Sequence, residues 1–250
     1  VISCPNCQSR LHFASTFSSH LGIFSCPKCT YKRPNPNVSA KNLKFNKDFS
    51  TSLTLTVNRE QLTVNYPLPG LYNVYNVLAA AACAVSYGIE NNKIINSIQK
   101  FSPAFGRFQS VQVNDKFVLI FLIKNPTGAN EVLRTIANTK NLNILAILND
   151  KIADSHDVSW IWDTNWQILK GKVNNFYVSG VRALDMATRA KYANIALDPG
   201  NIESDIEKAL EKSLSKVQKG QSLIVLPTYT AMISLQKSLH KLGGTKWHAQ

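Results

Sequence analysis

Two Cys-x-x-Cys pairs near the start of the chain constrain its fold more than any other feature. Cys4 and Cys7 form the first pair, Cys26 and Cys29 form the second, and 18 residues separate the pairs. Each pair places two thiolates on one tight turn, and two facing turns complete a tetrahedral four-sulfur shell around Zn2+. Such a closed shell leaves no coordination position for a substrate. We therefore expect a zinc ribbon over residues 1–37 in which the metal supports folding and takes no part in catalysis.

Disulfides and a redox dithiol pair are the alternatives to zinc. The chain opens on a cysteine pair and carries no export signal, which argues against disulfides, and the paired turns argue against a redox role. No run approaches the roughly 18 consecutive apolar residues that a spanning helix needs. With 44% apolar and 17% charged residues the chain is not disordered. These features predict a soluble, cytoplasmic protein with no transmembrane segment.

The charge of the chain is positive and uneven. The net charge is +13, and residues 1–50 alone hold seven Lys or Arg side chains against one acid. A surplus of this size is typical of proteins that meet polyanions such as nucleic acid, phosphorylated substrates or acidic lipid. One hypothesis is thus a non-enzymatic zinc-ribbon protein that binds nucleic acid through its basic N-terminal region. The ribbon has only Arg10 and Arg33 as arginines, so a dense arginine and aromatic surface is absent from it.

The segment after the ribbon predicts a β-hairpin followed by helices. A break with two prolines at residues 33–37 ends the ribbon, and residues 52–57 and 61–66 alternate between apolar and polar side chains. Residues 71–87 are almost all apolar or small, apart from Asn73 and Asn76, and predict one buried helix in which Cys83 is a small buried residue. A short helix follows near residues 93–101, and residues 102–106 read as a linker.

From residue 117 onward, short apolar strands alternate with helices. Repeated units of this kind predict a mostly parallel sheet covered on both faces, which is an α/β fold. The expected strands are 117–123, 142–148, 174–179, 193–197 and 222–226. The expected helices are 128–139, 181–192, 202–217 and 229–242.

The residues just after the strands are candidates for function, because ligands of open α/β sheets bind at the carboxyl ends of the strands. Lys124 and Asn125 precede a helix N-terminus, where phosphate is favoured. The segment 149–163 holds four aspartates, one histidine and two tryptophans. After the last strand, the hydroxyls of Thr228 and Thr230 are expected to cap the final helix. The chain contains neither a G-x-x-x-x-G-K-[ST] nor a G-x-G-x-x-G phosphate loop.

Taken together, these segments resemble the MurT family, the Mur-ligase-like subunits of lipid II isoglutaminyl synthase. The resemblance runs along the whole chain in order. It is carried by the cysteine ribbon, Gly70-Leu-Tyr-Asn-Val-Tyr-Asn76, Gly106-Arg-Phe-Gln109, Lys124-Asn-Pro-Thr-Gly128, the loop 149–163 and Leu226-Pro-Thr-Tyr-Thr230. It implies that residues 38–103 are the C-terminal part of a Mur ligase central (ATPase) domain. Residues 104–250 would be the Rossmann-like C-terminal domain of the same ligases.

The resemblance also implies a ligase reaction on lipid II, a peptidoglycan precursor. The D-glutamate α-carboxyl of the stem peptide would be phosphorylated by ATP with Mg2+ and then attacked by ammonia, which gives D-isoglutamine. A GatD-type glutaminase subunit would supply the ammonia, and no nucleic-acid partner is expected. The family places the orienting acid of the glutaminase triad on the MurT-like chain, at the position of Asp157 here.

The nucleotide-contacting positions of Mur ligases match Asn73, Arg107 and Asn125. Three departures from the family pattern bear on these assignments. The phosphate loop should precede the ribbon, so we expect this chain to begin midway through the ATPase domain and to be inactive alone. Ser155 stands where the family has glycine, which would strain a backbone with positive φ, and Phe121 replaces an acidic residue.

Two points stay open on the sequence. A shift of one turn in the loop would present a different acid in place of Asp157, namely Asp150, Asp154 or Asp163. A truncated or degenerate form that retains only a surface for partner docking is a third hypothesis beside the synthetase subunit and the nucleic-acid binder.

Overall fold

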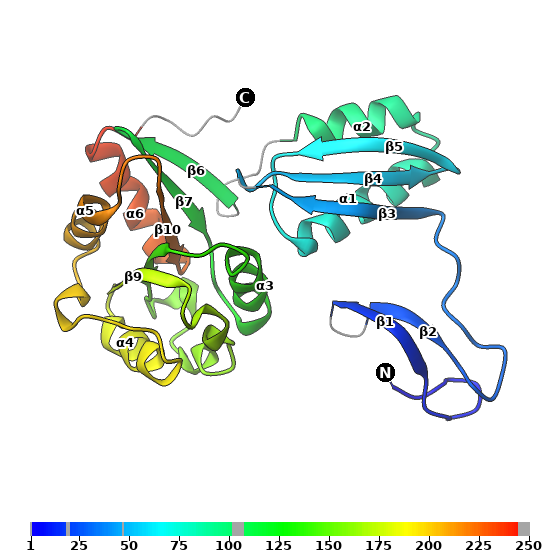
Figure 1. The fold of residues 1–250 in the computed structure, drawn as a ribbon, viewed down its shortest axis with the longest axis horizontal. Helices are drawn as coiled ribbons and strands as arrows, with labels where there is room; N and C mark the ends of the chain where they lie inside the picture. Colours follow the sequence, from blue (N-terminus) through cyan, green and yellow to red (C-terminus); the bar gives the residue numbers. More distant parts are fainter. Residues whose placement is uncertain (1, 19–20, 47, 102–107, 245–250) are drawn as a thin grey trace. The chain divides into compact units, whose positions relative to one another are not determined.

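The computed structural model describes residues 2–18, 21–46, 48–101 and 108–244. The chain divides into two compact units (Figure 1). Unit 1 comprises Val1–Lys44, Ser52–Asn65 and Asn73–Gln99, and unit 2 comprises Phe45–Thr51, Tyr66–Tyr72 and Lys100–Gln250. No helix of the described part is long and apolar enough to cross a bilayer.

Unit 1 contains the ribbon hairpin and most of a three-stranded sheet. The hairpin is antiparallel and consists of β1 (His12–Ser18) and β2 (Leu21–Ser25). The sheet has the order β3-β4-β5, with β3 at Val38–Phe45, β4 at Thr51–Val57 and β5 at Glu60–Tyr66. Two helices follow, α1 (Leu71–Ser86) and α2 (Asn91–Gln99). The hairpin predicted at 52–57 and 61–66 is confirmed, because its alternating pattern buries every second residue of β4.

Helix α1 is less buried than its composition predicted. Its buried residues are Asn73, Val74, Val77 and Ala81, which form a single stripe, and Cys83 is exposed. The predicted helix is present, but it is buried along one stripe only, and the prediction that Cys83 is buried is wrong. Alanine is tolerated at exposed helix positions because it costs no side-chain entropy there, so an Ala-rich run does not by itself predict burial.

Unit 2 is built on a five-stranded sheet in the order β6-β7-β10-β8-β9. The four neighbouring strands β7, β10, β8 and β9 are parallel to one another, and β6 pairs antiparallel with β7. The mostly parallel sheet is thus confirmed. The strands are β6 (Phe108–Val113), β7 (Lys116–Phe121), β8 (Leu142–Ile147), β9 (Val173–Ser179) and β10 (Ser222–Pro227). The helices are α3 (Pro126–Ile136), α4 (Ala183–Tyr192), α5 (Ile206–Lys216) and α6 (Tyr229–Lys241), with short 3-10 turns at Ile152–Asp154, Ser159–Ile161, Trp166–Leu169 and Pro199–Asn201.

Both faces of this sheet are covered, as predicted. Every residue of β8 is buried. Ile144 and Ala146 belong to one apolar cluster, whereas Leu145 and Ile147 belong to a second cluster that includes residues of α5 and α6. Because successive side chains of a strand point to opposite faces, a single strand supplies both cores.

The prediction of a strand at 193–197 is wrong. Ala193 is the C-cap of α4, and Asn194 adopts φ +57, which turns the chain out of the helix. Ile195 is buried in the core as a loop residue. The fifth strand is β6 instead, which reverses into β7 through a turn where Asn114 has φ +53. A short apolar run indicates a buried segment but does not by itself predict a strand, and residues 193–197 contribute to the core from a loop.

Candidate functional site

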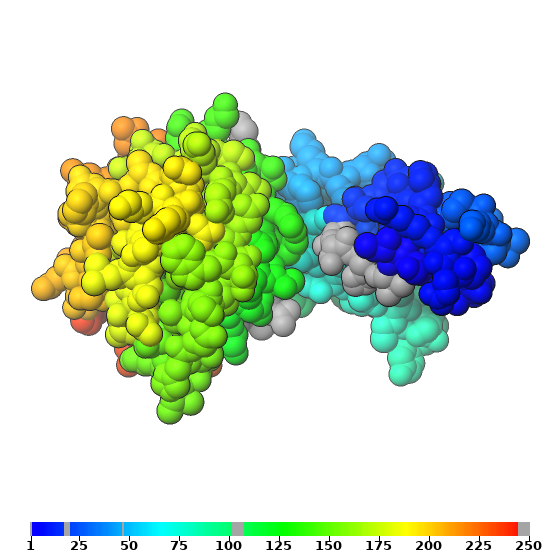
Figure 2. Space-filling view, turned by 90° about the horizontal axis from the view of Figure 1, so that it is seen from below, coloured from blue at the N-terminus to red at the C-terminus, as the bar shows by residue number. Residues whose placement is uncertain are grey.

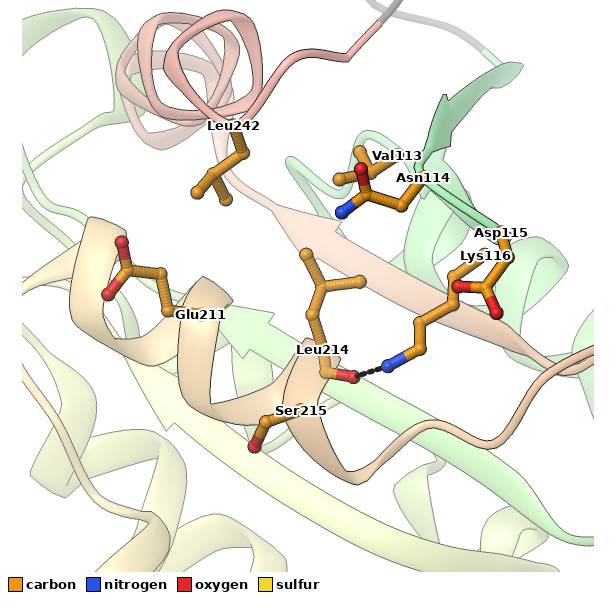
Figure 3. Close-up of a pocket in the computed structure, with 8 residues that line it drawn as sticks. All are labelled: Val113, Asn114, Asp115, Lys116, Glu211, Leu214, Ser215 and Leu242. Carbon is orange, nitrogen blue, oxygen red and sulfur yellow. Dashed lines mark hydrogen bonds between the residues drawn. The ribbon is translucent and has the colours of Figure 1, made fainter.

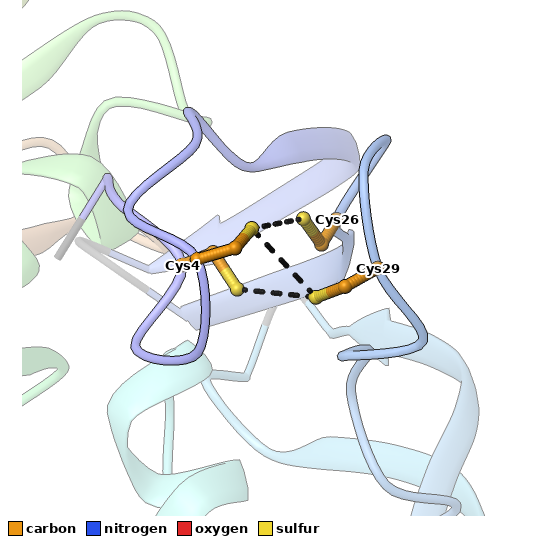
Figure 4. A group of neighbouring side chains, drawn as sticks. Cys4, Cys26 and Cys29 are labelled. Carbon is orange, nitrogen blue, oxygen red and sulfur yellow. Dashed lines mark hydrogen bonds between the residues drawn. The ribbon is translucent and has the colours of Figure 1, made fainter.

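The four cysteines come together as the spacing predicts. All four Sγ atoms lie within 4.8 Å of one another. Cys4 Sγ is 3.5 Å from Cys29 Sγ, and Cys7 Sγ is 3.5 Å from Cys26 Sγ. Figure 4 shows the thiols converging from the two turns. Among the described residues this is the group of His, Cys, Asp and Glu side chains that could hold a metal ion.

The donor set and its dimensions fit Zn2+. Zinc–sulfur bonds of about 2.3 Å in a tetrahedron place neighbouring sulfurs about 3.8 Å apart. Cys7 Sγ and Cys29 Sγ are 3.8 Å apart, and the backbone N–H of Lys28 donates to Cys26 Sγ at 3.4 Å. That N–H would stabilise negative charge on a ligating sulfur. The four sulfurs close the shell, so any metal held here has a structural role.

The thiols are poised unequally for deprotonation. The hydroxyl and backbone N–H of Ser9 lower the pKa of Cys7 to about 6, and Cys26 adds to this effect. The backbone N–H of Tyr31 lowers the pKa of Cys29, but burial and the neighbouring thiols outweigh it and raise that pKa to about 12. One thiolate is therefore available near neutral pH, and a cation would be needed to hold four of them together.

The aspartates of the loop 149–163 occupy different environments. Asp154 is buried, and its Oδ1 accepts a hydrogen bond from the backbone N–H of Thr230 at 2.8 Å while its Oδ2 accepts from the Thr230 hydroxyl. Thr230 is the second residue of α6, so Asp154 caps this helix from a distant segment. Thr228 occupies the N-cap position without a capping bond from its side chain, which corrects the expectation that the local hydroxyls cap the helix.

Asp150 and Asp157 also differ. Asp150 forms an ion pair with Arg182 Nε at 2.8 Å. Asp157 is exposed, and its carboxylate accepts from the backbone N–H of Ser159 at 2.8 Å. The hydroxyl and backbone N–H of Ser159 lower the pKa of Asp157, so it is a carboxylate at neutral pH. Asp163 is exposed as well.

The residue between these acids has an unusual backbone. Ser155 has φ +76 and ψ 139, a backbone conformation that residues other than glycine rarely adopt. The strain expected of serine at this position is therefore present in the geometry. The turn separates the buried Asp154 from the exposed Asp157.

A buried arginine fixes the second half of the loop. Arg189 on α4 donates from Nε to the carbonyl of Ile161 at 3.0 Å and from Nη2 to the carbonyl of Thr164 at 2.7 Å. Its guanidinium also lies 5.5 Å from the ring centroid of Trp162, and burial lowers its pKa. The buried guanidinium of Arg189 thus ties the tryptophan segment to α4 through two backbone carbonyls.

The polar residues after the strands have structural bonds in this structure. Asn125 is the N-cap of α3, where its Oδ1 accepts from the backbone N–H of Gly128 at 2.8 Å. Lys124 beside it is exposed. Asn149 is buried and donates its backbone N–H to the Thr228 hydroxyl at 3.1 Å.

The other nucleotide candidates lie elsewhere. Asn73 is in unit 1, is buried on α1 and accepts from Asn76 Nδ2 at 3.2 Å. Arg107 lies outside the described residues. Phe121 is buried on β7 against Phe108, with a centroid separation of 5.0 Å, so this position serves the core.

A cavity of about 310 Å³ lies between the β6–β7 turn, α5 and the end of α6 (Figure 3). Lys116 at its edge donates to the carbonyl of Leu214 at 2.8 Å, and Asp115 and Glu211 also line it. Neither Asn125 nor Asp157 lines this cavity.

Sequence reasoning missed the roles of Asp154 and Arg189. For Asp154 the available signal was a carboxylate in a loop and a final helix without an acidic residue in its first turn. For Arg189 there was no signal, because an arginine in an amphipathic helix is ordinarily exposed.

Comparisons with known protein families and structures agree with the observed fold. The MurT ligase C-terminal family model matches residues 122–232, and the Mur ligase middle domain model matches residues 13–84. The MurT subunit of lipid II isoglutaminyl synthase (glutamine-hydrolyzing) from Streptococcus pneumoniae is 30% identical over 95% of this chain and 52% of its own length. The MurT subunit from Staphylococcus aureus strain COL is 29% identical, with the same coverage of 95% and 52%.

Among solved structures, a pseudomurein peptide ligase type C from Methanothermus fervidus aligns with a TM-score of 0.69 and 24% identity, over 96% of this chain and 49% of its own. This likeness supports the Mur ligase fold. The chain spans about half the length of the curated relatives it matches.

Proposed function

We propose, from the premise that this chain is MurT-like and carries the middle and C-terminal domains of Mur ligases, that it acts as part of a glutamine-dependent ligase of cell-wall synthesis. The observation that carries the proposal is the match to two MurT subunits over 95% of the chain. The proposed reaction is ATP-dependent amidation of the D-glutamate α-carboxyl of lipid II in the cytoplasm. Ammonia comes from a GatD-type glutaminase partner.

In this proposal Asp157 orients the catalytic histidine of the partner. A carboxylate on the second imidazole nitrogen fixes the tautomer of the base and stabilises the imidazolium that forms during acyl transfer. Asp157 suits this task because it is exposed and its lowered pKa keeps it charged. Asp154 and Asp150 are engaged by Thr230 and Arg182, which leaves Asp163 as the exposed alternative.

Apolar side chains beside the loop support docking of a partner protein there. Ile152 is 88% exposed, Leu184 is 71% exposed and Val181 is 61% exposed. Ile152 lies near Asp150 in the sequence, and Val181 and Leu184 lie near Arg182. The ion pair of Asp150 with Arg182 therefore joins the two segments that carry these apolar side chains. Apolar residues ringed by charged ones are typical of protein interfaces. Ile152 belongs to the same loop as Asp157.

The candidate nucleotide contacts are Asn73, Arg107 and Asn125, and the guanidinium of an arginine such as Arg107 suits phosphate charge. ATP and Mg2+ also need a phosphate loop, which is absent from these 250 residues. The N-cap position of Asn125 supports an anion nearby, since backbone N–H groups at a helix start point toward negative charge. Zinc in the four-cysteine cluster would have a structural role only. The corresponding domains are residues 1–37, 38–103 and 104–250.

The experiment is glutamine hydrolysis by a purified GatD-type glutaminase with this chain added. We expect the native chain to stimulate hydrolysis, and the Asp157→Asn variant to bind the glutaminase equally well without stimulating it. The loss should be large, because the wrong histidine tautomer costs about 10⁴ in kcat in a related triad. The matched control is Asp163→Asn, an exposed aspartate of the same loop.

Each outcome decides a different part of the proposal. If Asp163→Asn abolishes stimulation and Asp157→Asn does not, the orienting residue is Asp163. If the native chain neither binds nor stimulates the glutaminase, the partner assignment fails for this chain.

A further inference from the structure

The ribbon hairpin has one face that forms its core and one that faces outward. Burial alternates along β2, with Leu21, Ile23 and Ser25 exposed and Gly22 and Phe24 turned toward the core. Phe24 packs against Phe13 and Tyr31 beside the cysteine cluster. The inner face of the hairpin is therefore packed, and the apolar side chains on the opposite face are exposed to solvent.

Strand pairing defines this outer face. Ser25 pairs with His12 on β1 and forms a bridge with Lys32 on its other side. Residues paired directly across antiparallel strands have their side chains on the same face. Leu21, Ile23, His12 and Lys32 thus share one face, which we call the outer ribbon face. Leu21 is 40% exposed and Ile23 is 47% exposed.

The charged side chains of the segment that carries this face have a single sign. Residues 1–47 contain seven Lys or Arg side chains and no Asp or Glu. Four thiolates with one Zn2+ would subtract about two charges, which leaves the region strongly positive. Lys28 and Lys32 are exposed within the ribbon. Figure 2 shows the ribbon in dark blue at the surface of the molecule.

Exposed aliphatic side chains on a basic segment fit one kind of partner best. A second copy of this chain would bring like charges together. Nucleic acid would satisfy the cations, and its bases stack on aromatic rings. The exposed aromatic ring of the hairpin is Phe17, at 43% exposure, but Arg33 Cζ already lies 5.4 Å from its centroid. The apolar side chains of the outer ribbon face, Leu21 and Ile23, are aliphatic. The boundary between headgroups and acyl chains of an anionic bilayer satisfies both features, because it takes up apolar side chains and attracts cations.

We propose that the outer ribbon face binds the surface of an anionic phospholipid bilayer. Leu21 and Ile23 enter the headgroup boundary, and Lys32 on the same face meets the lipid phosphates. The contact is peripheral and reversible, because two half-exposed aliphatic side chains and a few cations give modest affinity. This inference rests on the ribbon alone, so it stands or falls separately from the amidation chemistry. Where the substrate is lipid-linked, such a contact would raise its local concentration.

The test is cosedimentation of the native chain with vesicles of phosphatidylcholine that contain about one-third phosphatidylglycerol, compared with vesicles of phosphatidylcholine alone. We expect binding to the anionic vesicles only, and weaker binding at high salt. The double variant Leu21→Ser and Ile23→Ser should lower the partition coefficient about thirtyfold, from the apolar area it removes. The matched control removes two exposed apolar side chains of unit 1 outside the ribbon, Tyr87→Ser and Ile89→Ser, and should bind as the native chain does.

Circular dichroism and metal content, compared with those of the native chain, show whether the ribbon of each variant is intact. If the double variant misfolds, Leu21→Gln at the end of β2 replaces it, with an expected loss of about fivefold. The proposal is overturned if anionic vesicles bind no more chain than neutral ones, or if an intact variant binds as well as the native chain. It is also overturned if the chain binds an RNA oligonucleotide through Leu21 and Ile23 and does not bind vesicles.

Discussion

Replacing Ser155 by glycine should stabilise unit 2. Ser155 has φ +76 and ψ 139, and holding a non-glycine residue in such a region costs about 1–3 kcal/mol. Glycine relieves this cost but loses more conformational entropy on folding, by about 0.5–1 kcal/mol. The side chain of Ser155 is exposed, so little packing is lost. The net expectation for Ser155→Gly is a free energy of unfolding about 0–2.5 kcal/mol higher.

Tryptophan fluorescence during urea unfolding measures this change in the right part of the molecule. The four tryptophans of the chain are at positions 160, 162, 166 and 247, all within the stretch Lys100–Gln250 of unit 2. Thermal unfolding gives a second measure, with a rise of roughly 2–4 °C in Tm for each kcal/mol in a domain of this size.

Two control variants isolate the backbone effect. Ser155→Ala removes the hydroxyl and keeps the strain, so it should change stability by less than about 0.5 kcal/mol. Ser215→Gly places glycine in α5, where no positive φ is relieved, and should destabilise unit 2 by about 0.5 kcal/mol. A Ser155→Gly variant less stable than the native chain would refute the reasoning, because the strain relieved would then be smaller than the entropy that glycine costs.

Three further predictions follow from the described contacts. Asp154→Ala should destabilise unit 2 by about 2–3 kcal/mol in urea unfolding, because it leaves the start of α6 uncapped, whereas Asp163→Ala should be close to neutral. NMR titration of Asp157 should give a pKa below the ordinary value of about 3.9, and Ser159→Ala should raise it. Because the folded-state pKa is lowered, the small stabilisation from Asp157 is present above the unfolded-state pKa and is lost as pH falls through the folded-state value. Cys26→Ser should abolish stoichiometric zinc in elemental analysis and leave the fluorescence-monitored unfolding of unit 2 unchanged, and a variant that keeps its zinc would contradict the four-sulfur site.

The sequence predicted those parts of the fold that depend on local patterns. The cysteine spacing determines a knuckle geometry within a few residues, and runs of apolar residues mark the parallel strands. It failed where burial depends on what another segment covers. Cys83 lies in an Ala-rich helix that is buried along one stripe only, and Ile195 reaches the core from a loop. The antiparallel β6 was missed because residues 108–113 lie beside the predicted linker and mix polar with apolar side chains.

The aspartate loop shows why the candidate site was harder to predict than the fold. Its acids are chemically identical in sequence, and their environments are set by partners far along the chain. Asp154 is taken by Thr230, 76 residues away, through bonds that no local pattern announces. The strained residue Ser155 lies between the two acids, and Asp157 is exposed whereas Asp154 is buried. The same loop thus holds a buried acid with a structural role and an exposed acid, Asp157, whose carboxylate accepts from the backbone N–H of Ser159. A substitution that relaxed this turn without moving Asp157 would separate the stability of the loop from its proposed function.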